Sequence, residues 1–310
     1  KSRREGKPLS IAVADQKMAV EYVELNEQAK VLYSQFLPGP VTIVSFAKNK
    51  VAPGVASEFR TLGVRIPDYP LITELVRSLG KPITATSANA SGKKRPYTIA
   101  DVLNRLSNHQ KQLIDLVIDA GTLPPNPPST VIDTTLSTPL TMRQGALAIG
   151  TAGQPGTTTT YHSNSDQETK DLAGRLLLKH YETMKKTGLV IGLDGELGAG
   201  KTVFTKGLGS FLRISETINS PTYSYYQEYP YQREQQTGTL FHADVWKIDT
   251  QAEFELLDMQ SLIQPGSVLV VEWWHQVATY FQPIIQVPVV QIKITDQGAT
   301  KRLITVTEPT

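Results

Sequence analysis

Hydrophobic patterning divides the first half of the chain into short strands and helices. Short β-branched segments bounded by Pro, Gly or Asn predict strands. Apolar positions at helical spacing predict helices. The expected strands are 41–47, 62–66, 82–86 and 130–133, and the expected helices are 15–19, 29–36, 71–79, 99–106 and 110–117.

The second half shows a more regular alternation. An amphipathic helix is expected at 168–186, because Leu172, Leu176 and Tyr181 lie near one face. Continuous apolar segments at 189–193 and 268–273 predict buried strands. The alternation predicts a largely parallel sheet flanked by helices. The other expected elements are strands at 223–229, 239–246, 287–295 and 302–307 and helices at 203–212 and 252–263.

Residues 146–166 separate the two halves. This stretch is rich in Gly, Thr, Ser, Asn and Pro and has no apolar periodicity, so it predicts a linker. A chain of 310 residues suits two domains at about 100–200 residues each. We therefore expect an α/β domain with a twisted mixed sheet at 1–145 and a second α/β domain at 167–310.

Composition excludes several classes of protein. With 40% apolar and 19% charged residues, each half can bury a core, so a fully disordered chain is excluded. No apolar run approaches the ~18–20 residues that span a bilayer. The absence of cysteine excludes disulfide scaffolds, thiolate zinc sites and a cysteine nucleophile. No signal peptide is visible, and a cytoplasmic protein without membrane contact is expected.

The charge is distributed unevenly. Residues 1–150 hold 18 Lys and Arg against 12 Asp and Glu, whereas residues 151–310 hold 13 against 17. The first half is therefore basic and the second acidic. A basic half favours polyanionic partners such as nucleotides or RNA.

The sequence GELGAGKT satisfies the phosphate-loop pattern GxxxxGK[ST] in full. It follows a predicted buried strand and precedes a helix, which is the context that the pattern requires. Lys201 is expected to reach the β- and γ-phosphates and Thr202 to bind Mg²⁺. No NKxD-like motif for guanine follows, so ATP is preferred to GTP. The expected nucleotide-binding residues of this loop are Gly195, Glu196, Leu197, Gly198, Ala199, Gly200, Lys201 and Thr202.

Two acids follow predicted strands of the same half. Asp244 ends LFHAD and Glu272 ends VLVVE. The carboxyl ends of parallel strands lie beside the phosphate loop, where a carboxylate can hold Mg²⁺ or orient water. The alternative is a solvated acid at a strand end. The functional interpretation is favoured for Glu272, and both stay open for Asp244.

Four segments in order resemble the TsaE (YjeE) family, small bacterial ATPases of tRNA threonylcarbamoyladenosine synthesis. They are GELGAGKT, SPTYSYYQEY (220–229), FHADVWK (241–247) and VVEW (270–273), and the resemblance covers 163–310. It implies that Thr202 and Glu272 bind Mg²⁺, that Asp244 supports hydrolysis and that Thr169 lies near the nucleotide. It also implies a switch-like segment at 220–222 near the γ-phosphate. The family pattern H-x-D-x-Y-R appears as HADVWK, which puts a bidentate arginine contact in doubt.

Polar groups follow the short strands of the basic half. Arg and Lys with nearby Ser hydroxyls can cradle a triphosphate. The opening basic run can equally be a solvated tail, and Arg65 a partner in a structural ion pair. The candidates are Lys1, Arg3, Lys7, Arg65, Ser87, Asn89, Ser129 and Arg143.

Six segments resemble the YrdC-like family of L-threonylcarbamoyladenylate synthases over residues 1–145. They are KSRREGKPLSI, LPGPVTIV, TLGVRIPDYP, PITATSANASG, STVID and RQG. The resemblance implies that Lys1 and Arg3 form a catalytic KxR element and that Arg65 and Ser129 bind threonine. It gives the ATP site to Arg3, Lys7, Thr61, Ser87, Asn89, Arg95 and Arg143. The family usually opens with a strand and a PTDTxYGL-type segment that helps to hold threonine, and Lys1 aligns after it. We therefore expect a first domain that is incomplete at its start.

Together the resemblances imply a fusion that makes threonylcarbamoyl-AMP from L-threonine, bicarbonate and ATP and carries an ATPase acting on the TsaD and TsaB transferase complex. Contact with tRNA would be indirect, through that complex or the basic half. Two other classes remain open. One is a P-loop kinase of small molecules, marked by a phosphorylated acceptor. The other is an RNA-binding assembly factor with an ATPase switch, marked by tight tRNA binding without threonine-dependent pyrophosphate release.

Overall fold

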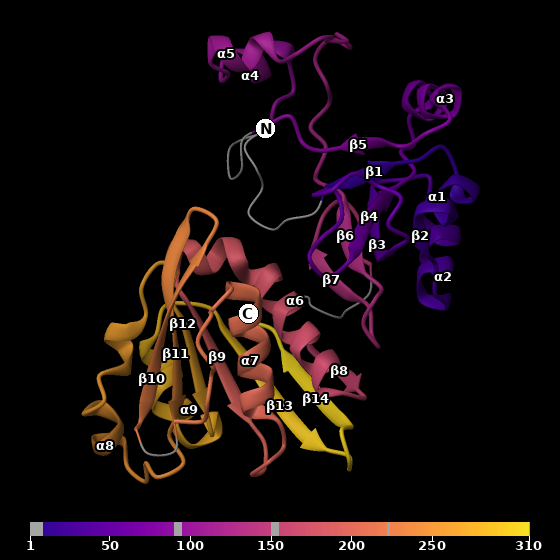
Figure 1. Cartoon of the computed structure of the whole chain (residues 1–310). Coiled ribbons are helices and arrows are strands. Elements are labelled where there is room, and N and C mark those ends of the chain that lie inside the picture. The colour runs from indigo at the N-terminus through magenta and orange to yellow at the C-terminus, as the bar shows by residue number, and fades with distance from the viewer. Residues whose placement is uncertain (1–8, 90–94, 150–154, 222–223, 310) are drawn as a thin grey trace.

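The chain folds into two α/β domains, each built on its own seven-stranded sheet (Figure 1). The computed structural model describes residues 9–89, 95–149, 155–221 and 224–309. The α/β class predicted from the sequence is confirmed. In these ranges no helix is long and apolar enough to cross a membrane.

The first domain has a mixed sheet in the order β5-β1-β4-β3-β6-β7, with β2 paired to β3. Strands β1 and β4 are parallel, as are β3 and β6, and the other pairs are antiparallel. The strands are β1 (Ser10–Ala12), β2 (Val23–Glu24), β3 (Val41–Ala47), β4 (Thr61–Arg65), β5 (Ile83–Ala85), β6 (Thr130–Asp133) and β7 (Leu140–Arg143). The helices are α1 (Gln16–Tyr22), α2 (Glu27–Phe36), α3 (Pro70–Leu79), α4 (Ile99–Leu103) and α5 (Asn108–Gln112).

The second domain has the strand order β10-β11-β12-β9-β13-β14-β8. The four central strands β11, β12, β9 and β13 are parallel, and the outer pairs are antiparallel. The strands are β8 (Thr158–Ser163), β9 (Leu189–Asp194), β10 (Tyr226–Arg233), β11 (Gln236–Asp244), β12 (Val268–Glu272), β13 (Val289–Asp296) and β14 (Arg302–Thr307). The helices are α6 (Asp166–Thr187), α7 (Lys201–Leu212), α8 (Gln251–Glu255), η1 (Met259–Leu262), α9 (Trp274–Phe281) and η2 (Gln282–Ile284).

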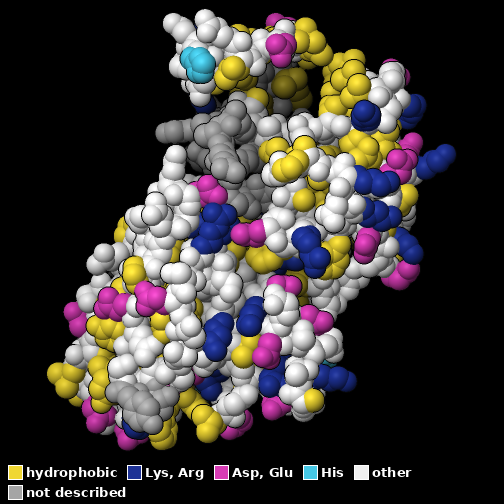
Figure 2. Space-filling view, viewed as in Figure 1, with side chains coloured by type: hydrophobic (Ala, Val, Ile, Leu, Met, Phe, Trp, Pro, Cys, Tyr) yellow, Lys and Arg dark blue, Asp and Glu magenta, His cyan; other side chains and the backbone are white. Residues whose placement is uncertain are grey.

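The surfaces of the two domains differ in charge. Lys and Arg side chains are frequent over the α1–α3 side of the first domain, whereas Asp and Glu are frequent at the α8 end of the second (Figure 2). The view agrees with the excess of 6 positive charges in residues 1–150 and of 4 negative charges in residues 151–310.

The expected linker at 146–166 is wrong in its second part. Residues 158–163 form β8, which pairs with β14, and Asp166 begins α6. Thr159, Tyr161 and Ser163 face the core and alternate with exposed residues. Threonine is β-branched and suits such a half-buried strand, but its polarity concealed the alternation from a hydrophobicity argument.

Three expected helices end early, and the one at 99–106 stops at Leu103. The helix at 110–117 stops at Gln112, and the apolar residues after it are exposed. A short helix without a packed apolar face is marginal in water, so the local pattern was insufficient. The helix at 252–263 is broken into α8 and η1, with Asp258 between them at φ 44°. The sequence argument also missed α9, which begins directly after β12.

Gly192 in β9 lies against the ring of Trp274 from α9. A Cβ at this position would stand 2.3 Å from Cγ of Trp274, which is far inside van der Waals contact. Both residues are buried in the second domain, where close packing resists overfilling.

We expect Gly192→Ala to destabilise the second domain by roughly 1–3 kcal/mol, the usual range for overpacked cores. Urea unfolding followed by tryptophan fluorescence measures the change. A midpoint equal to that of the unsubstituted chain would contradict the close approach of α9 to β9.

Candidate active sites

The GELGAGKT segment forms a loop between β9 and α7, as the sequence predicted. Gly195, Gly198 and Gly200 have φ values of 151°, 78° and 110°, which side chains rarely adopt. A Cβ on Gly195 would also meet the carbonyl oxygen of Ile294 at 2.4 Å. Glycine is therefore required for the loop to curl so that its N–H groups and the start of α7 face one space.

Lys201 is held inside this loop. Its side chain is 5% exposed, and Nζ donates to the carbonyl oxygens of Gly195 at 2.8 Å and Glu196 at 3.1 Å. The ammonium also lies 4.4 Å from the ring centroid of Trp273. The ammonium group is thus held against the backbone of the loop.

Glu272 is the centre of the buried polar groups beside the loop. Its Oε1 lies 2.8 Å from Nε2 of His242 and accepts a hydrogen bond from Thr202 Oγ1 at 3.4 Å. Nζ of Lys201 lies 3.9 Å from Oε2. Nδ1 of His242 lies 3.1 Å from the carbonyl oxygen of Asn219. The two ring nitrogens of His242 therefore face two oxygen acceptors, the carboxyl group of Glu272 and the carbonyl group of Asn219.

These donors fit Mg²⁺ only together with a nucleotide. In residues 9–89, 95–149, 155–221 and 224–309, no three His, Asp or Glu are grouped to hold a metal ion. Thr202 and Glu272 offer two oxygens next to the phosphate loop. Protein Mg²⁺ sites commonly combine one or two such ligands with substrate phosphates and water, so the arrangement is suitable.

Asp244 lies at the end of β11, opposite Glu272 in the sheet register. Burial raises the pKa of its carboxyl above the ordinary value of 3.8, and the charge of Glu272 adds to this, while the hydrogen bond from Trp246 N and the charges of Lys201 and His242 oppose it. The two acids therefore share one edge of the sheet, as the parallel-strand argument predicted.

We expect Asp244→Asn to unfold at a higher temperature than the unsubstituted chain at pH 7. An acid whose folded pKa is raised pays an ionisation cost in the native state above that pKa, and a neutral amide does not. The gain should shrink as pH falls toward 3.8, where the unfolded carboxyl is also protonated. Calorimetry over this pH range measures it.

Asp115→Asn, at an exposed aspartate, is the control and should show no such gain. An Asp244→Asn chain less stable than the parent at pH 7 would show that Asp244 stabilises the fold instead.

The second half has further candidates besides the phosphate loop and its two acids. Thr169 is buried, and its hydroxyl shares a 2.8 Å hydrogen bond with Ser163 Oγ at the junction of β8 and α6. Ser220 is exposed, and Thr222 lies outside the described residues. Trp246 is half-exposed, and Lys247 Nζ lies 5.3 Å from its ring centroid.

The first domain contributes most of the wall of a cavity of about 1050 Å³. The cavity lies over β1, β4 and the start of β6 and is large enough for a nucleotide with a second substrate. Five candidates from this half line it: Thr61, Arg65, Ser87, Ser129 and Arg143. Arg95 lines it too; like Thr61, it had been assigned by the family resemblance alone.

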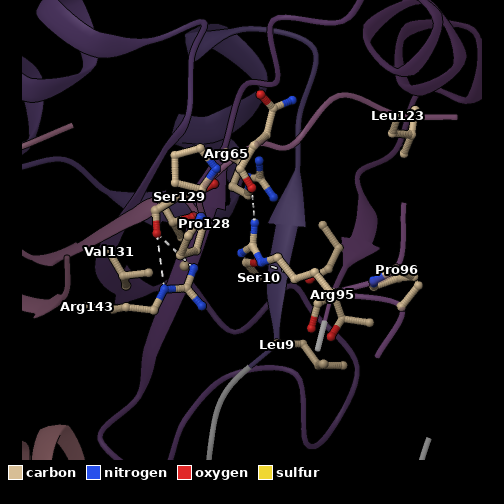
Figure 3. A pocket seen from close by; sticks show the side chains of 18 of the residues that line it. Leu9, Ser10, Arg65, Arg95, Pro96, Leu123, Pro128, Ser129, Val131 and Arg143 are labelled. Atoms are coloured by element: carbon tan, nitrogen blue, oxygen red, sulfur yellow. Dashed lines mark hydrogen bonds between the residues drawn. The ribbon is translucent and has the colours of Figure 1, made fainter. Parts of the chain in front are cut away.

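Arg143 and Ser129 are joined at one side of this cavity (Figure 3). Nε and Nη2 of Arg143 donate to the carbonyl oxygen of Ser129 at 3.2 and 2.9 Å. Arg143 ends β7 and Ser129 precedes β6, so the pairing of these two strands brings them together. The bond holds Ser129 in place beside the guanidinium.

Arg65 and Arg95 provide positive charge at the same cavity (Figure 3). Burial lowers the pKa of Arg65, and the charge of Arg95 lowers it further. Nε of Arg65 is buried and has no hydrogen-bond partner among the described residues. Two cations with an unused buried donor favour an anionic ligand, whose charge would offset both.

Of the four other candidates, only Asn89 belongs to the described residues. Asn89 follows Ser87 by two residues but is outside the lining. Lys1, Arg3 and Lys7 lie outside the described residues.

The sequence argument missed the contribution of the second domain. Arg175, Leu178, Lys179 and Glu182 of α6 line the cavity together with the first domain. They recur at intervals of three and four residues and so occupy one helix face. That spacing is visible in the sequence, but the core pattern of α6 gives no sign that a second face meets another domain.

Two family models match the chain in succession. The Sua5/YciO/YrdC model, described as telomere recombination, matches residues 1–145. The TsaE model, described as threonylcarbamoyl adenosine biosynthesis protein TsaE, matches residues 163–304. A putative threonylcarbamoyl-AMP synthase of Methanocaldococcus jannaschii is 37% identical over 48% of this chain and 68% of its own length. The chain belongs to the Sua5/YciO/YrdC family, and it carries a TsaE domain after it.

Relatives of each half were also found. The TsaE of Bacillus subtilis is 36% identical over 35% of this chain and 62% of its own length. The crystal structure of E. coli YciO is 26% identical over 46% of this chain and 68% of that one, with a TM-score of 0.42. The chain spans only about half the length of further threonylcarbamoyl-AMP synthases that it matches, 52% and 54% in two of them.

Proposed function

We propose that the first domain synthesises L-threonylcarbamoyl-AMP and that the second is a P-loop ATPase of the same tRNA modification. The observation that carries the first part is the cavity of about 1050 Å³, because Arg65, Arg95, Arg143 and Ser129 converge on it. The family membership supplies the reaction. The phosphate loop with Lys201 and Glu272 carries the second part.

The reaction needs orientation and positive charge rather than a protein nucleophile. The amine of L-threonine and bicarbonate give a carbamate, with loss of water. A carbamate oxygen then attacks the α-phosphorus of ATP, the bond to the β-phosphate oxygen breaks, and pyrophosphate leaves with the electron pair. Positioning and electrostatic stabilisation supply most of the acceleration in such transfers.

The residues of the cavity suit these tasks. Arg65 would pair with the threonine carboxylate, and Ser129 would donate a hydrogen bond to the same substrate. Arg95 and Arg143 would neutralise the phosphates, with Thr61 and Ser87 as hydroxyl partners. The family pattern would assign Arg3, Lys7 and Asn89 to ATP and would make Lys1 and Arg3 the catalytic KxR element.

In the second domain, Lys201 would bind the β- and γ-phosphates and Asp244 would support attack by water. Mg²⁺, held by Thr202 and Glu272, would neutralise charge on the phosphates. Glu272 must then exchange part of its contact with His242 for the ion. This domain would act with the TsaD and TsaB proteins in the cytoplasm, and tRNA would be met indirectly.

Pyrophosphate release measured with and without L-threonine and bicarbonate tests the proposal. Release that requires both substrates supports it, and mass spectrometry should find threonylcarbamoyl-AMP. A phosphorylated acceptor would favour a kinase. Tight tRNA binding without threonine-dependent release would favour an RNA-binding assembly factor.

A further inference from the structure

Helix α6 contributes both to the core of the second domain and to the wall of the cavity. It belongs to the second domain and lies on the side that faces the first (Figure 1). One of its faces packs into the core of the second domain through Leu172, Leu176 and Leu177. Another face closes the cavity of the first domain through Arg175, Leu178, Lys179 and Glu182. The synthase cavity is therefore incomplete without the ATPase domain.

Arg175 joins α6 to the end of β6. Its side chain is 3% exposed and forms an ion pair with Asp133, which is equally buried. Nη1 also donates to Thr135 Oγ1 at 2.5 Å. Asp133 accepts further hydrogen bonds from the Thr135 amide and hydroxyl, at 2.9 and 2.6 Å. The strand that begins next to Ser129 is thus held at its other end by the second domain.

Phe59 forms a second contact between the two domains, beside the ion pair of Arg175 and Asp133. The guanidinium of Arg175 lies 4.7 Å from its ring centroid, and Phe211 of α7 stacks on it with a centroid distance of 6.2 Å. Gly174 leaves the room for this ring, because a Cβ there would stand 2.8 Å from Cζ of Phe59. Neighbouring Glu58 pairs with the fully buried Arg233.

Residues 57–61 form a turn that contains Phe59 and ends at Thr61. Ser57 Oγ lies 2.7 Å from Thr61 Oγ1 and accepts from the amides of Phe59 and Thr61 at 3.2 and 3.1 Å. Phe59 and Thr61 both line the cavity. Because this turn is closed by its own hydrogen bonds, a displaced Phe59 ring would shift Thr61.

We infer that Arg175 is a positioning residue for the synthase reaction, setting Ser129 through β6 and Thr61 through Phe59 from the ATPase domain. This inference rests on the proposed function. Removing one partner of a buried ion pair leaves the other uncompensated, so without Arg175 the buried Asp133 carboxylate keeps its bonds from Thr135 but loses its counter-charge, which favours its displacement. Neither residue belongs to the phosphate loop.

Steady-state kinetics of the full chain test the inference. We expect Arg175→Ala to raise KM for L-threonine and for ATP roughly tenfold in threonine-dependent pyrophosphate release, with a smaller change in kcat. Phosphate release at the P-loop should be unchanged. Arg175→Lys should recover part of the loss, since lysine can pair with Asp133 but cannot also stack flat on Phe59.

Gly174→Ala approaches the same contact without removing a charge. It should raise KM for ATP more than KM for L-threonine, because it displaces Phe59 and Thr61 and leaves Asp133 paired. In the double variant with Phe59→Ala the clash is gone, so Gly174→Ala should add no further increase. Arg213→Ala is the control, because it removes a half-exposed ion pair of the same domain outside the cavity lining.

A folded Arg175→Ala chain with unchanged KM values would overturn the inference. If Arg175→Ala does not fold, Gly174→Ala decides by the same criterion. If the unsubstituted chain shows no threonine-dependent release, the proposed function fails. The inference is then tested by measuring ATP binding with calorimetry in chains that carry Lys201→Ala. This substitution disables the P-loop, so the binding that remains reports on the cavity. Binding weakened roughly tenfold by Arg175→Ala supports the inference. Binding that is absent, or indifferent to Arg175→Ala, overturns it.

Discussion

Replacing Lys201 with alanine is expected to lower phosphate release from ATP at the P-loop by about 100-fold or more, the usual effect of removing one charged stabiliser from a phosphoryl-transfer site. Lys201 is the buried cation of the loop, with Nζ 2.8 Å from the carbonyl oxygen of Gly195. Threonine-dependent pyrophosphate release should stay nearly unchanged, because the cavity has its own arginines. Parallel assays of phosphate and pyrophosphate measure the two activities in one sample.

Lys206→Ala is the matched control, since Lys206 lies on the same helix, five residues after Lys201. It should leave both activities at the level of the unsubstituted chain. An equal loss of both activities in Lys201→Ala would show that the chain has a single nucleotide site.

Arg143→Ala should give the reverse pattern. A charge-assisted hydrogen bond is worth about 1.5–3 kcal/mol, and each ~1.4 kcal/mol is a factor of ten in rate. We therefore expect threonine-dependent pyrophosphate release to fall about tenfold or more. The loss has two sources, the phosphate contact and the support that Arg143 gives to the Ser129 carbonyl at 2.9 Å.

Arg77→Ala removes an arginine from α3 in the same domain, outside the lining of the cavity, and should not change this activity. Synthase kinetics unaffected by Arg143→Ala would mean that Arg143 only supports β7 and that ATP binds elsewhere.

The phosphate loop and its acids could be predicted because their geometry is local or follows from sheet topology. GELGAGKT fixes its own turn through three glycines, and parallel pairing puts Asp244 opposite Glu272. The role of His242 as a partner of Glu272 could not be predicted, because it depends on which face of β11 turns toward the loop. The sequence signal available for His242 was its His-x-Asp spacing with Asp244.

The cavity lined mostly by the first domain was predictable only in part. Arg143 and Ser129 were named from different segments, and β6–β7 pairing explains why they meet. Arg175 carried no signal, because an arginine on an amphipathic helix normally faces water. Its burial depends on Asp133, forty-two positions earlier in the chain. Only the docking of the two domains brings this pair together.

The pairing of β8 with β14 places the start of the second domain beside its end. The amide of Glu308 donates to the carbonyl oxygen of Thr157 at 3.0 Å, and that of Gly156 donates to Pro309 at 3.2 Å. A domain whose first and last residues are adjacent can be joined to, or inserted into, another protein. The flanking chain then does not have to cross the surface of the domain. Circular permutants of the second domain, opened at another loop, should therefore be tolerated by the same geometry.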